Sequence, residues 1–299
     1  MTDTAIPSNG DMPLAEARQR RVALLMITLV VLFVLVPFLF WRDTWFGRAL
    51  TDEEMGQYLA DQDKPRHIQH ALVQMGERIN RGDPTAKRWY PQLLQLTGNP
   101  HPEIRVTLAW VLGADHRAEE FHRALLPLLQ DAEPMVRRNA ALSLVRFGDA
   151  SGREEFLAML RPYAVRAPAD GTLSYRLPQG NAAERGTLLA RLETSQGTLE
   201  VSSPVPGTVE KWLAEEQSRV AAEQEILVLM PGSEQVWEAM RALYLVGRAE
   251  DLPEVERYAR GAVSDLADEV RQQASLTAAE IRRRALQNRE SNEENRGKQ

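Results

Sequence analysis

The side chains most able to bind a metal or transfer a proton are five histidines: His67, His70, His101, His116 and His122. His67 and His70 are three residues apart, a spacing that places both on one face of a helix. No acidic residue follows them at the spacing of a zinc site, so the pattern favours solvated or helix-capping histidines. The sequence therefore predicts no metal site.

Nucleophiles and cofactor-binding motifs are equally sparse. The chain has no cysteine, which excludes disulfides, thiolate catalysis and cysteine metal sites. It also has no phosphate-binding loop, no dinucleotide fingerprint and no Gly-x-Ser-x-Gly motif. We therefore expect no catalytic residue, no cofactor and no enzymatic activity.

The composition is that of a folded protein with an acidic balance. The 299 residues, 43% apolar and 26% charged, suffice for two folded units with substantial cores. The formal net charge is −6 and the pI is about 5.6. Nucleic acid is not expected as a partner, because phosphate binding requires a basic surface.

One segment near the N-terminus predicts a transmembrane helix. Residues 22–41 (VALLMITLVVLFVLVPFLFW) carry no charge, and about 20 apolar residues span a bilayer core. Trp41, Trp45 and Phe46 stand where an aromatic belt would contact lipid. No small-x-small cleavage site follows, so the pattern favours an uncleaved anchor over a signal peptide.

The flanking arginines predict the orientation of this anchor. Arg18, Arg20 and Arg21 precede the apolar segment, and Arg42 and Arg48 follow it. Because positive charge favours the cytoplasmic side, the N-terminus is expected in the cytoplasm and the body outside it. The predicted location is therefore the bacterial inner membrane, with a single pass and a periplasmic body.

The body contains a repeated helical pattern. Residues 99–112 (NPHPEIRVTLAWVL) and 131–144 (DAEPMVRRNAALSL) match at an offset of 32, and each follows a leucine-rich segment, 90–96 and 124–130. Proline fits the first turn of a helix, and the apolar spacing buries one helix face against the next unit. The pattern resembles the HEAT-repeat family of helical solenoids. Residues 64–72 and 268–274 look like further copies of the second helix.

The periodicity changes to short β segments between residues 164 and 232. The third leucine-rich helix, 152–160, lacks an adjacent partner, which the sequence places at 234–246. Within the insert, PADGTL at 168–173 matches PVPGTV at 204–209. Two similar β halves in tandem resemble the biotinyl/lipoyl carrier domain, a flattened β-barrel with quasi-twofold symmetry.

This resemblance implies a site for a covalently attached cofactor, and the sequence departs from it there. The family presents a lysine on the hairpin between its halves, whereas Gln196 occupies that position within ETSQG at 193–197. An amide cannot be acylated as a lysine amine is, so no swinging arm is expected. Glu216 and Glu223 also replace expected turn glycines.

The sequence thus predicts a membrane-anchored, mainly α protein: a HEAT-like α-solenoid with an inserted small all-β, lipoyl-like (barrel-sandwich) domain. The predicted division is a disordered leader (1–21), the anchor (22–41), a juxtamembrane connector (42–64), repeats (65–163), the β insert (164–232), further repeat helices (233–286) and a disordered tail (287–299).

The predicted function is that of a non-catalytic scaffold or accessory subunit that binds proteins of a membrane complex. The repeats and the insert would supply the contacts, with Trp212 and Trp237 as candidate partner-binding residues. One alternative is a periplasmic adaptor of a transport or secretion system similar to membrane-fusion proteins, although the long α-hairpin of that family is absent. Another is a carrier or enzyme, such as a lyase bearing HEAT-like repeats.

Overall fold

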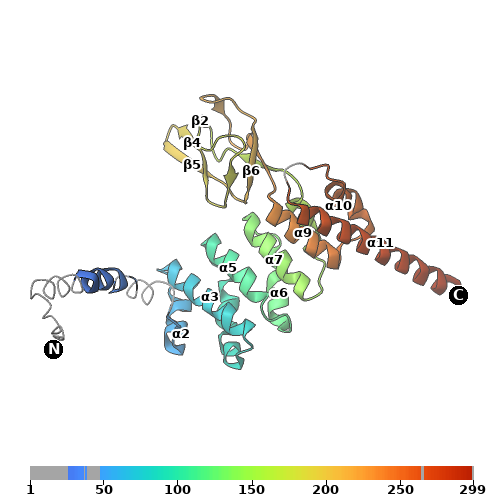
Figure 1. Ribbon diagram of the computed structural model, residues 1–299, viewed down its shortest axis with the longest axis horizontal. Coiled ribbons are helices and arrows are strands. Elements are labelled where there is room, and N and C mark those ends of the chain that lie inside the picture. Colours follow the sequence, from blue (N-terminus) through green and yellow to red (C-terminus); the bar gives the residue numbers. More distant parts are fainter. Residues whose placement is uncertain (1–25, 37, 39–47, 264–265, 298–299) are drawn as a thin grey trace, which may run out of the picture. The chain divides into compact units, whose positions relative to one another are not determined.

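The computed structural model describes residues 26–36, 38, 48–263 and 266–297, and it divides into two units, residues 1–53 and 54–299 (Figure 1). In the first unit, residues 26–36 and 38 are helical. No helix among the described residues is long and apolar enough to span a membrane.

This finding corrects two predictions, the membrane-anchored fold class and the single-pass location in the bacterial inner membrane. Part of the predicted anchor lies outside the described residues, as do Trp41, Trp45, Phe46 and the leader 1–21. The described part of the predicted connector contains a helix, α2 (Asp52–Ala60).

After α2, the second unit continues with helices in consecutive pairs. The elements that follow, up to residue 159, are α3 (Pro65–Asn80), η1 (Pro84–Trp89), α4 (Tyr90–Gln95), η2 (Leu96–Gly98), α5 (Pro102–Leu112), α6 (Glu119–Leu128), α7 (Pro134–Arg146) and α8 (Arg153–Met159). We call the second helix of each pair a B helix. The B helices α3, α5 and α7 open on a proline, which needs no N–H partner in the first turn.

Each helix buries one face against its neighbours. On α5, Ile104, Leu108 and Leu112 follow one another at intervals of one turn and are fully buried. Phe121 and Leu125 form the matching buried face of α6. No pair covers its apolar face alone, so the pairs stack side by side, as Figure 1 shows for α3, α5 and α7.

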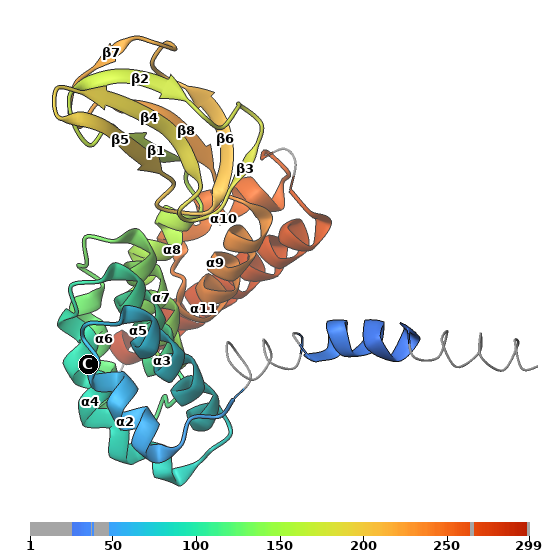
Figure 2. The same cartoon turned by 90° about the vertical axis from the view of Figure 1, so that its left-hand side faces the viewer.

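The β insert follows α8 directly and consists of β1 (Tyr163–Arg166), β2 (Gly171–Tyr175), β3 (Ala182–Ala183), β4 (Leu188–Thr194), β5 (Gly197–Ser202), β6 (Gly207–Trp212), β7 (Arg219–Val220) and β8 (Glu225–Met230). Its two antiparallel sheets have the orders β1-β8-β6-β3 and β5-β4-β2-β7, and they enclose one apolar core (Figure 2).

The two sheets have the same construction. Strands β1 to β4 of the first half correspond in order to β5 to β8 of the second, and each sheet combines two strands from each half. The equivalence extends to the turns. The amide of Gly186 donates to the carbonyl of Ser203, and the amide of Glu223 donates to that of Ala167 in the same way. The predicted β region with two similar halves is therefore present.

After the insert the helical stack resumes with α9 (Ser233–Val246), η3 (Ala249–Asp251), α10 (Leu252–Ala259) and α11 (Asp268–Gly297). Gln235 joins the two sides of the interruption: its Oε1 accepts from Arg138 Nη1 at 2.8 Å, and its Nε2 donates to the carbonyl of Met159 at 2.7 Å. Helix α9 thus completes the pair that α8 begins. Helix α11 continues to Gly297, so the described part of the segment predicted as a disordered tail is helical.

Candidate protein-docking groove

The B helices α5, α7, α9 and α11 border a groove of about 830 Å³. We call it the B-helix groove. Its lining comprises Trp110, Asn139, Leu142, Ser143, Val145, Arg146, Glu238, Arg241, Ala242, Tyr244, Leu245, Gln273 and Leu276.

Polar side chains on successive B helices hold the floor of the groove together. Asn139 Nδ2 on α7 donates to the carbonyl of Val106 on α5 at 2.9 Å, and Ser143 Oγ donates to that of Ala109 at 2.7 Å. Thr277 Oγ1 on α11 donates to the carbonyl of Met240 on α9 at 2.9 Å. These bonds fix neighbouring helices at short range, so the groove is formed before any partner arrives.

The groove exposes more apolar surface than a stacked helix normally leaves in water. Trp110 is 45% exposed and Leu245 is 58% exposed, and Tyr244 and Leu276 are exposed beside them. Gly76 on α3 leaves room for the Trp110 ring, because a Cβ there would lie 2.7 Å from its Cζ3. A contiguous apolar patch of this kind marks an interaction surface.

Two arginines give the groove positive charge. Among the described residues, neither Arg146 nor Arg241 forms an ion pair. The Arg241 guanidinium lies 4.6 Å from the centre of the Trp237 ring, a cation–π contact. Desolvation raises the pKa of the Glu238 carboxyl, Glu234 raises it further, and Arg241 opposes both.

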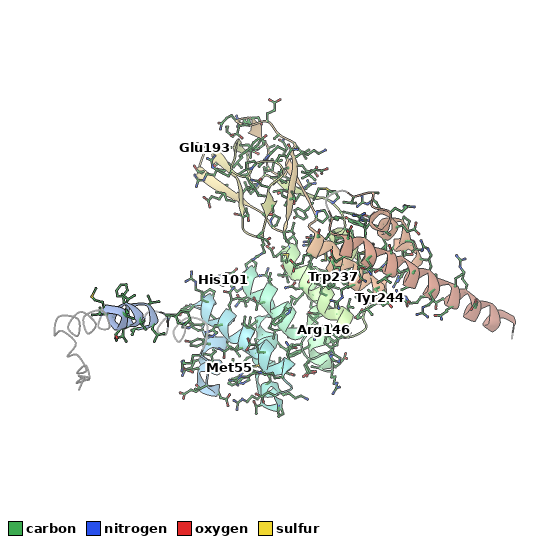
Figure 3. All side chains as sticks on the ribbon, in the orientation of Figure 1. Met55, His101, Arg146, Glu193, Trp237 and Tyr244 are labelled. Atoms are coloured by element: carbon green, nitrogen blue, oxygen red, sulfur yellow. The ribbon has the colours of Figure 1, made fainter. Side chains whose placement is uncertain are left out.

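The structure separates the two predicted partner-binding tryptophans. Trp237 is exposed at the edge of the B-helix groove, and Figure 3 shows it in the same part of the molecule as Arg146 and Tyr244. Trp212 belongs to the insert, where it is half-buried and stacks on Tyr175 with ring centres 3.8 Å apart. Neither tryptophan lines the groove, but Trp237 contacts Arg241, which does.

Gln196 lies in the tight turn between β4 and β5, and its side chain is exposed. Its backbone N–H donates to Thr194 Oγ1 at 3.1 Å, and Thr194 pairs with Gly197 across the turn. The glutamine thus occupies the tip of the hairpin that joins the two halves.

Two of the five histidines contact acidic side chains within the helical part of the chain. His67 Nδ1 lies 2.8 Å from an Asp61 carboxylate oxygen, and His122 Nε2 lies 2.7 Å from Asp149. Hydrogen bonds from Ser151 and His122 lower the pKa of Asp149 against the opposing effect of burial. Over the described residues, no three histidine or acidic side chains come together as metal ligands.

Of the residues at or beside the groove, the sequence predicted only Trp237 as a partner-binding residue. Residues 243–246 (LYLV) are four consecutive apolar residues, and a helix with one buried face cannot bury all four. The same signal is present around Trp110, where residues 108–112 (LAWVL) are five consecutive apolar residues. Each stretch indicates an exposed apolar residue, although neither tells which one it is.

Comparison with known proteins supports the helical part. A model of the family "HEAT repeats" matches residues 90–172, so the predicted HEAT-like repeats are confirmed over the helical part of that segment, up to the end of α8 at Met159. No curated protein matches the chain. A solved single-chain, multi-domain long-chain acyl-CoA carboxylase is 21% identical, with a TM-score of 0.23; the match covers 43% of this chain and 12% of the carboxylase. At that TM-score the similarity supports no inference about fold or function.

Proposed function

We propose that this protein is a non-catalytic scaffold that binds an amphipathic helix of a partner protein in the B-helix groove. The observation that carries the proposal is the collection of exposed apolar side chains from successive B helices, including Trp110, Tyr244 and Leu245, in one groove. HEAT repeats offer such extended surfaces for protein contact.

The charges of the groove restrict the partner further. Arg146 and Arg241 lie among the apolar residues, form no ion pair within the described residues, and outnumber the one carboxylate of the lining, Glu238. An amphipathic helix with an apolar stripe and flanking acidic side chains complements both features, because the stripe buries the apolar patch and the acids pair with the arginines.

We also propose that the β insert is a lipoyl-like domain without a swinging arm, and that it acts as a second docking surface. Its two equivalent halves and the position of Gln196 at the hairpin tip support this proposal. Leu199 on β5 is exposed near that tip and is a suitable contact residue. Intact-mass measurement of the native protein tests the missing arm, since an added lipoyl or biotinyl mass would contradict it.

The test of the groove compares capture by four forms of the full chain. Wild type, Leu245→Glu in the groove, Leu199→Glu in the insert and Leu286→Glu on α11 serve as baits in the same native extract. Leu286 is exposed and lies outside the groove lining, so its variant is the matched control. We expect one partner that Leu245→Glu loses and Leu286→Glu retains, and we expect Leu199→Glu to weaken contacts through the insert.

Binding measurements with purified proteins then identify the occupant of the groove. With the recovered partner, a single acidic helical segment should bind wild type, and Arg146→Glu with Arg241→Glu should weaken binding at least tenfold at low salt. Equal binding by Leu245→Glu and Leu286→Glu would contradict the groove. If light scattering shows a dimer of wild type that Leu245→Glu abolishes, then the occupant of the groove is a second copy of this chain and not a partner helix.

A further inference from the structure

Strand β5 is the longest of the outer strands of the insert. It has six residues, Gly197–Ser202, and lies at the end of its sheet. The other outer strands are shorter: β3 and β7 have two residues each, and β1 has four with an irregular register at Arg166. Short length and irregular register protect an edge from pairing with another chain. Strand β5 keeps a regular register from Gly197 to Val201, so its edge lacks both protections.

The register of β5 identifies its unpaired backbone groups. The turn before β5 contains two residues, and pairing begins with Thr194 and Gly197. A turn of this length is flanked by a hydrogen-bonded pair, and such pairs alternate with non-hydrogen-bonded ones along an antiparallel ladder. The N–H and C=O groups of Thr198 and Glu200 therefore point away from β4. No other group of the described residues forms a hydrogen bond with them, so they are available to an added strand.

Leu199 lies on the inner side of this edge but is not covered. It is two residues from Val201 and therefore points to the same side of the sheet. Val201 is 5% exposed, and Leu192, which lies opposite Leu199 on β4, is fully buried, whereas Leu199 is 42% exposed. The apolar core of the insert thus ends before its outer strand does, and an apolar side chain placed beside Leu199 would extend it.

A groove runs along the same edge, and we call it the edge groove. Its volume is about 610 Å³, and strand β1 and the last three residues of β5 line it. Pro168 and Pro204, which follow β1 and β5 at equivalent positions, line it as well. Figure 2 shows β1 and β5 on the same side of the insert. A strand added to β5 would therefore lie between the two outer strands.

The charges beside β5 are mainly acidic. Glu200 and Glu223 line the edge groove, and Glu193 lies at the adjoining end of β4. Neither Glu193 nor Glu223 forms an ion pair among the described residues. Arg166 also lines the groove, but its guanidinium already pairs with a carboxylate of β8 at 2.6 Å. A basic segment therefore complements this edge better than an acidic one.

We propose that β5 binds an extended segment of a partner protein, which adds to this edge as a further strand with alternating apolar and basic side chains. Main-chain hydrogen bonds with Thr198 and Glu200 supply affinity, and alternate side chains supply specificity. The apolar side chains cover Leu199, and the basic ones face Glu193 and Glu200 on the outer side of the sheet. This inference deepens the proposed second docking surface of the insert and rests on it.

A second copy of this chain complements the edge less well. Two β5 strands that pair antiparallel about Leu199 would place their Glu200 side chains diagonally across from each other on one face of the sheet. Like charges at neighbouring cross-strand positions are destabilising. The charge pattern therefore favours a different, basic partner.

The test measures binding of fluorescent peptides to the full chain by anisotropy. The probe has the length of β5 and alternates valine with lysine. Its lysines share the outer face with Thr198 and Glu200, so their backbone N–H groups face β5. N-methylation of the lysine residues should therefore weaken binding about tenfold or more. N-methylation of the valine residues is the matched control and should weaken it less than about threefold, while glutamate in place of lysine should weaken it at least about fivefold at low salt.

Variants of the chain locate the site. Glu200→Pro removes an N–H that points away from β4, so the insert should fold and the affinity should fall about tenfold or more. Glu200→Ala removes the charge but keeps the N–H and should cost about threefold or less. Leu245→Glu in the B-helix groove should not change the affinity. Hydrogen exchange should show that the probe protects the amides of Thr198 and Glu200, which are open in the free protein.

Equal binding of the two N-methylated peptides, equal binding by folded Glu200→Pro and Glu200→Ala, or no binding of the probe would overturn strand addition. The peptide comparison on wild type remains decisive if Glu200→Pro does not fold. A wild-type dimer that Glu200→Pro abolishes would instead make the occupant a second copy of this chain. If Leu199→Glu loses a partner from the extract that Glu200→Pro retains, the insert docks that partner without strand addition. If neither variant loses a partner and the probe does not bind, the second docking surface itself fails.

Discussion

Arg105 on α5 and Asp131 in the turn before α7 form a two-pronged ion pair, with Nε–Oδ2 at 2.7 Å and Nη2–Oδ1 at 2.9 Å. Arg105 Nη1 also donates to the carbonyl of Asn99 at 2.7 Å. Arg137 repeats the arrangement one unit later, with Glu155 as its acid and the Asp131 carbonyl as its acceptor. Each arginine thus ties its own turn to the next helix pair.

Removing this pair should destabilise the stack. Arg105 and Asp131 are mostly buried, and a hydrogen bond between charged groups contributes about 1.5–3 kcal/mol. We therefore expect Arg105→Met to lower the free energy of unfolding by about 2–3 kcal/mol at pH 7, measured in urea. Arg271→Met is the control and should cost under about 1 kcal/mol, because among the described residues Arg271 forms its one ion pair with Asp268, in an exposed position.

The same pair should respond to acid. The hydrogen bond from Arg105 lowers the pKa of Asp131 below its ordinary value. The stability that this carboxylate contributes is therefore complete above about pH 4–5 and is lost as the pH falls through the lower folded-state pKa. The difference between wild type and Arg105→Met should shrink between about pH 5 and pH 2. A difference that stays constant over that range would contradict the role of Asp131.

Gly76 and Trp110 are expected to be energetically coupled. A Cβ at Gly76 would lie 2.7 Å from the Trp110 ring, while alanine is favoured over glycine within a helix by about 1 kcal/mol. In a Trp110→Ala background, Gly76→Ala should raise the free energy of unfolding by about 1 kcal/mol. In the wild-type background the gain should vanish, because the ring must move. Four urea titrations form the double-mutant cycle, and an equal gain in both backgrounds would place the ring away from Gly76.

The turns of the insert offer a comparison between equivalent positions. Gly186 has a φ of 85°, and its counterpart Glu223 adopts a φ of 63° without being glycine. Left-handed backbone costs a non-glycine residue roughly 1–2 kcal/mol. We expect Gly186→Ala to destabilise the insert by about 1 kcal/mol and Glu223→Gly to leave it equal or slightly more stable. Thermal unfolding measures both.

The matched control is Gly98→Ala. Like Gly186, Gly98 would place a new Cβ in open space, but its φ is not positive. It should therefore lack the penalty of Gly186→Ala. Equal destabilisation by both variants would show that φ does not decide the cost.

The sequence predicted the parts of this fold that depend on local patterns. The Pro and Arg positions at 102–105 and 134–137 were sufficient to identify successive B helices, because each unit repeats the same local chemistry. The joining of α8 with α9 across the insert was also predicted, and Gln235 makes that joint. The resemblance to the carrier family implied turn glycines at the positions of Glu216 and Glu223; the structure has left-handed backbone at Gln217 and Glu223.

What escaped prediction depends on contacts between distant segments. Arg138 is buried against Gln235, a residue almost a hundred positions later, and nothing in the adjacent sequence distinguishes it from the more exposed Arg137. The choice of Leu245 over its apolar neighbours as an exposed residue follows from how α9 packs on α11. Such features require the assembled stack, since local propensity is the same for buried and exposed leucines.

The two tryptophans that the sequence predicts as partner-binding residues, Trp212 and Trp237, should differ in their contribution to the free energy of unfolding. Trp212 stacks on Tyr175, and Tyr175 also donates its hydroxyl to the carbonyl of Ala214, so the ring pair belongs to the framework of the insert. Trp212→Ala should cost about 2–4 kcal/mol of unfolding free energy, since a large aromatic contact is lost. Trp237 is exposed on α9, and Trp237→Ala should cost under about 1 kcal/mol.

For partner binding, the larger effect should come from Trp237→Ala and the smaller one from Trp212→Ala. Trp237 holds Arg241 at the edge of the B-helix groove, so Trp237→Ala should weaken capture of a groove partner several-fold while the protein stays folded. Tyr175→Phe is the control for the insert, because it keeps the stacked ring and removes only the hydroxyl contact. If Trp237→Ala destabilises the chain as much as Trp212→Ala does, then Trp237 is a packing residue and the edge of the groove lies elsewhere.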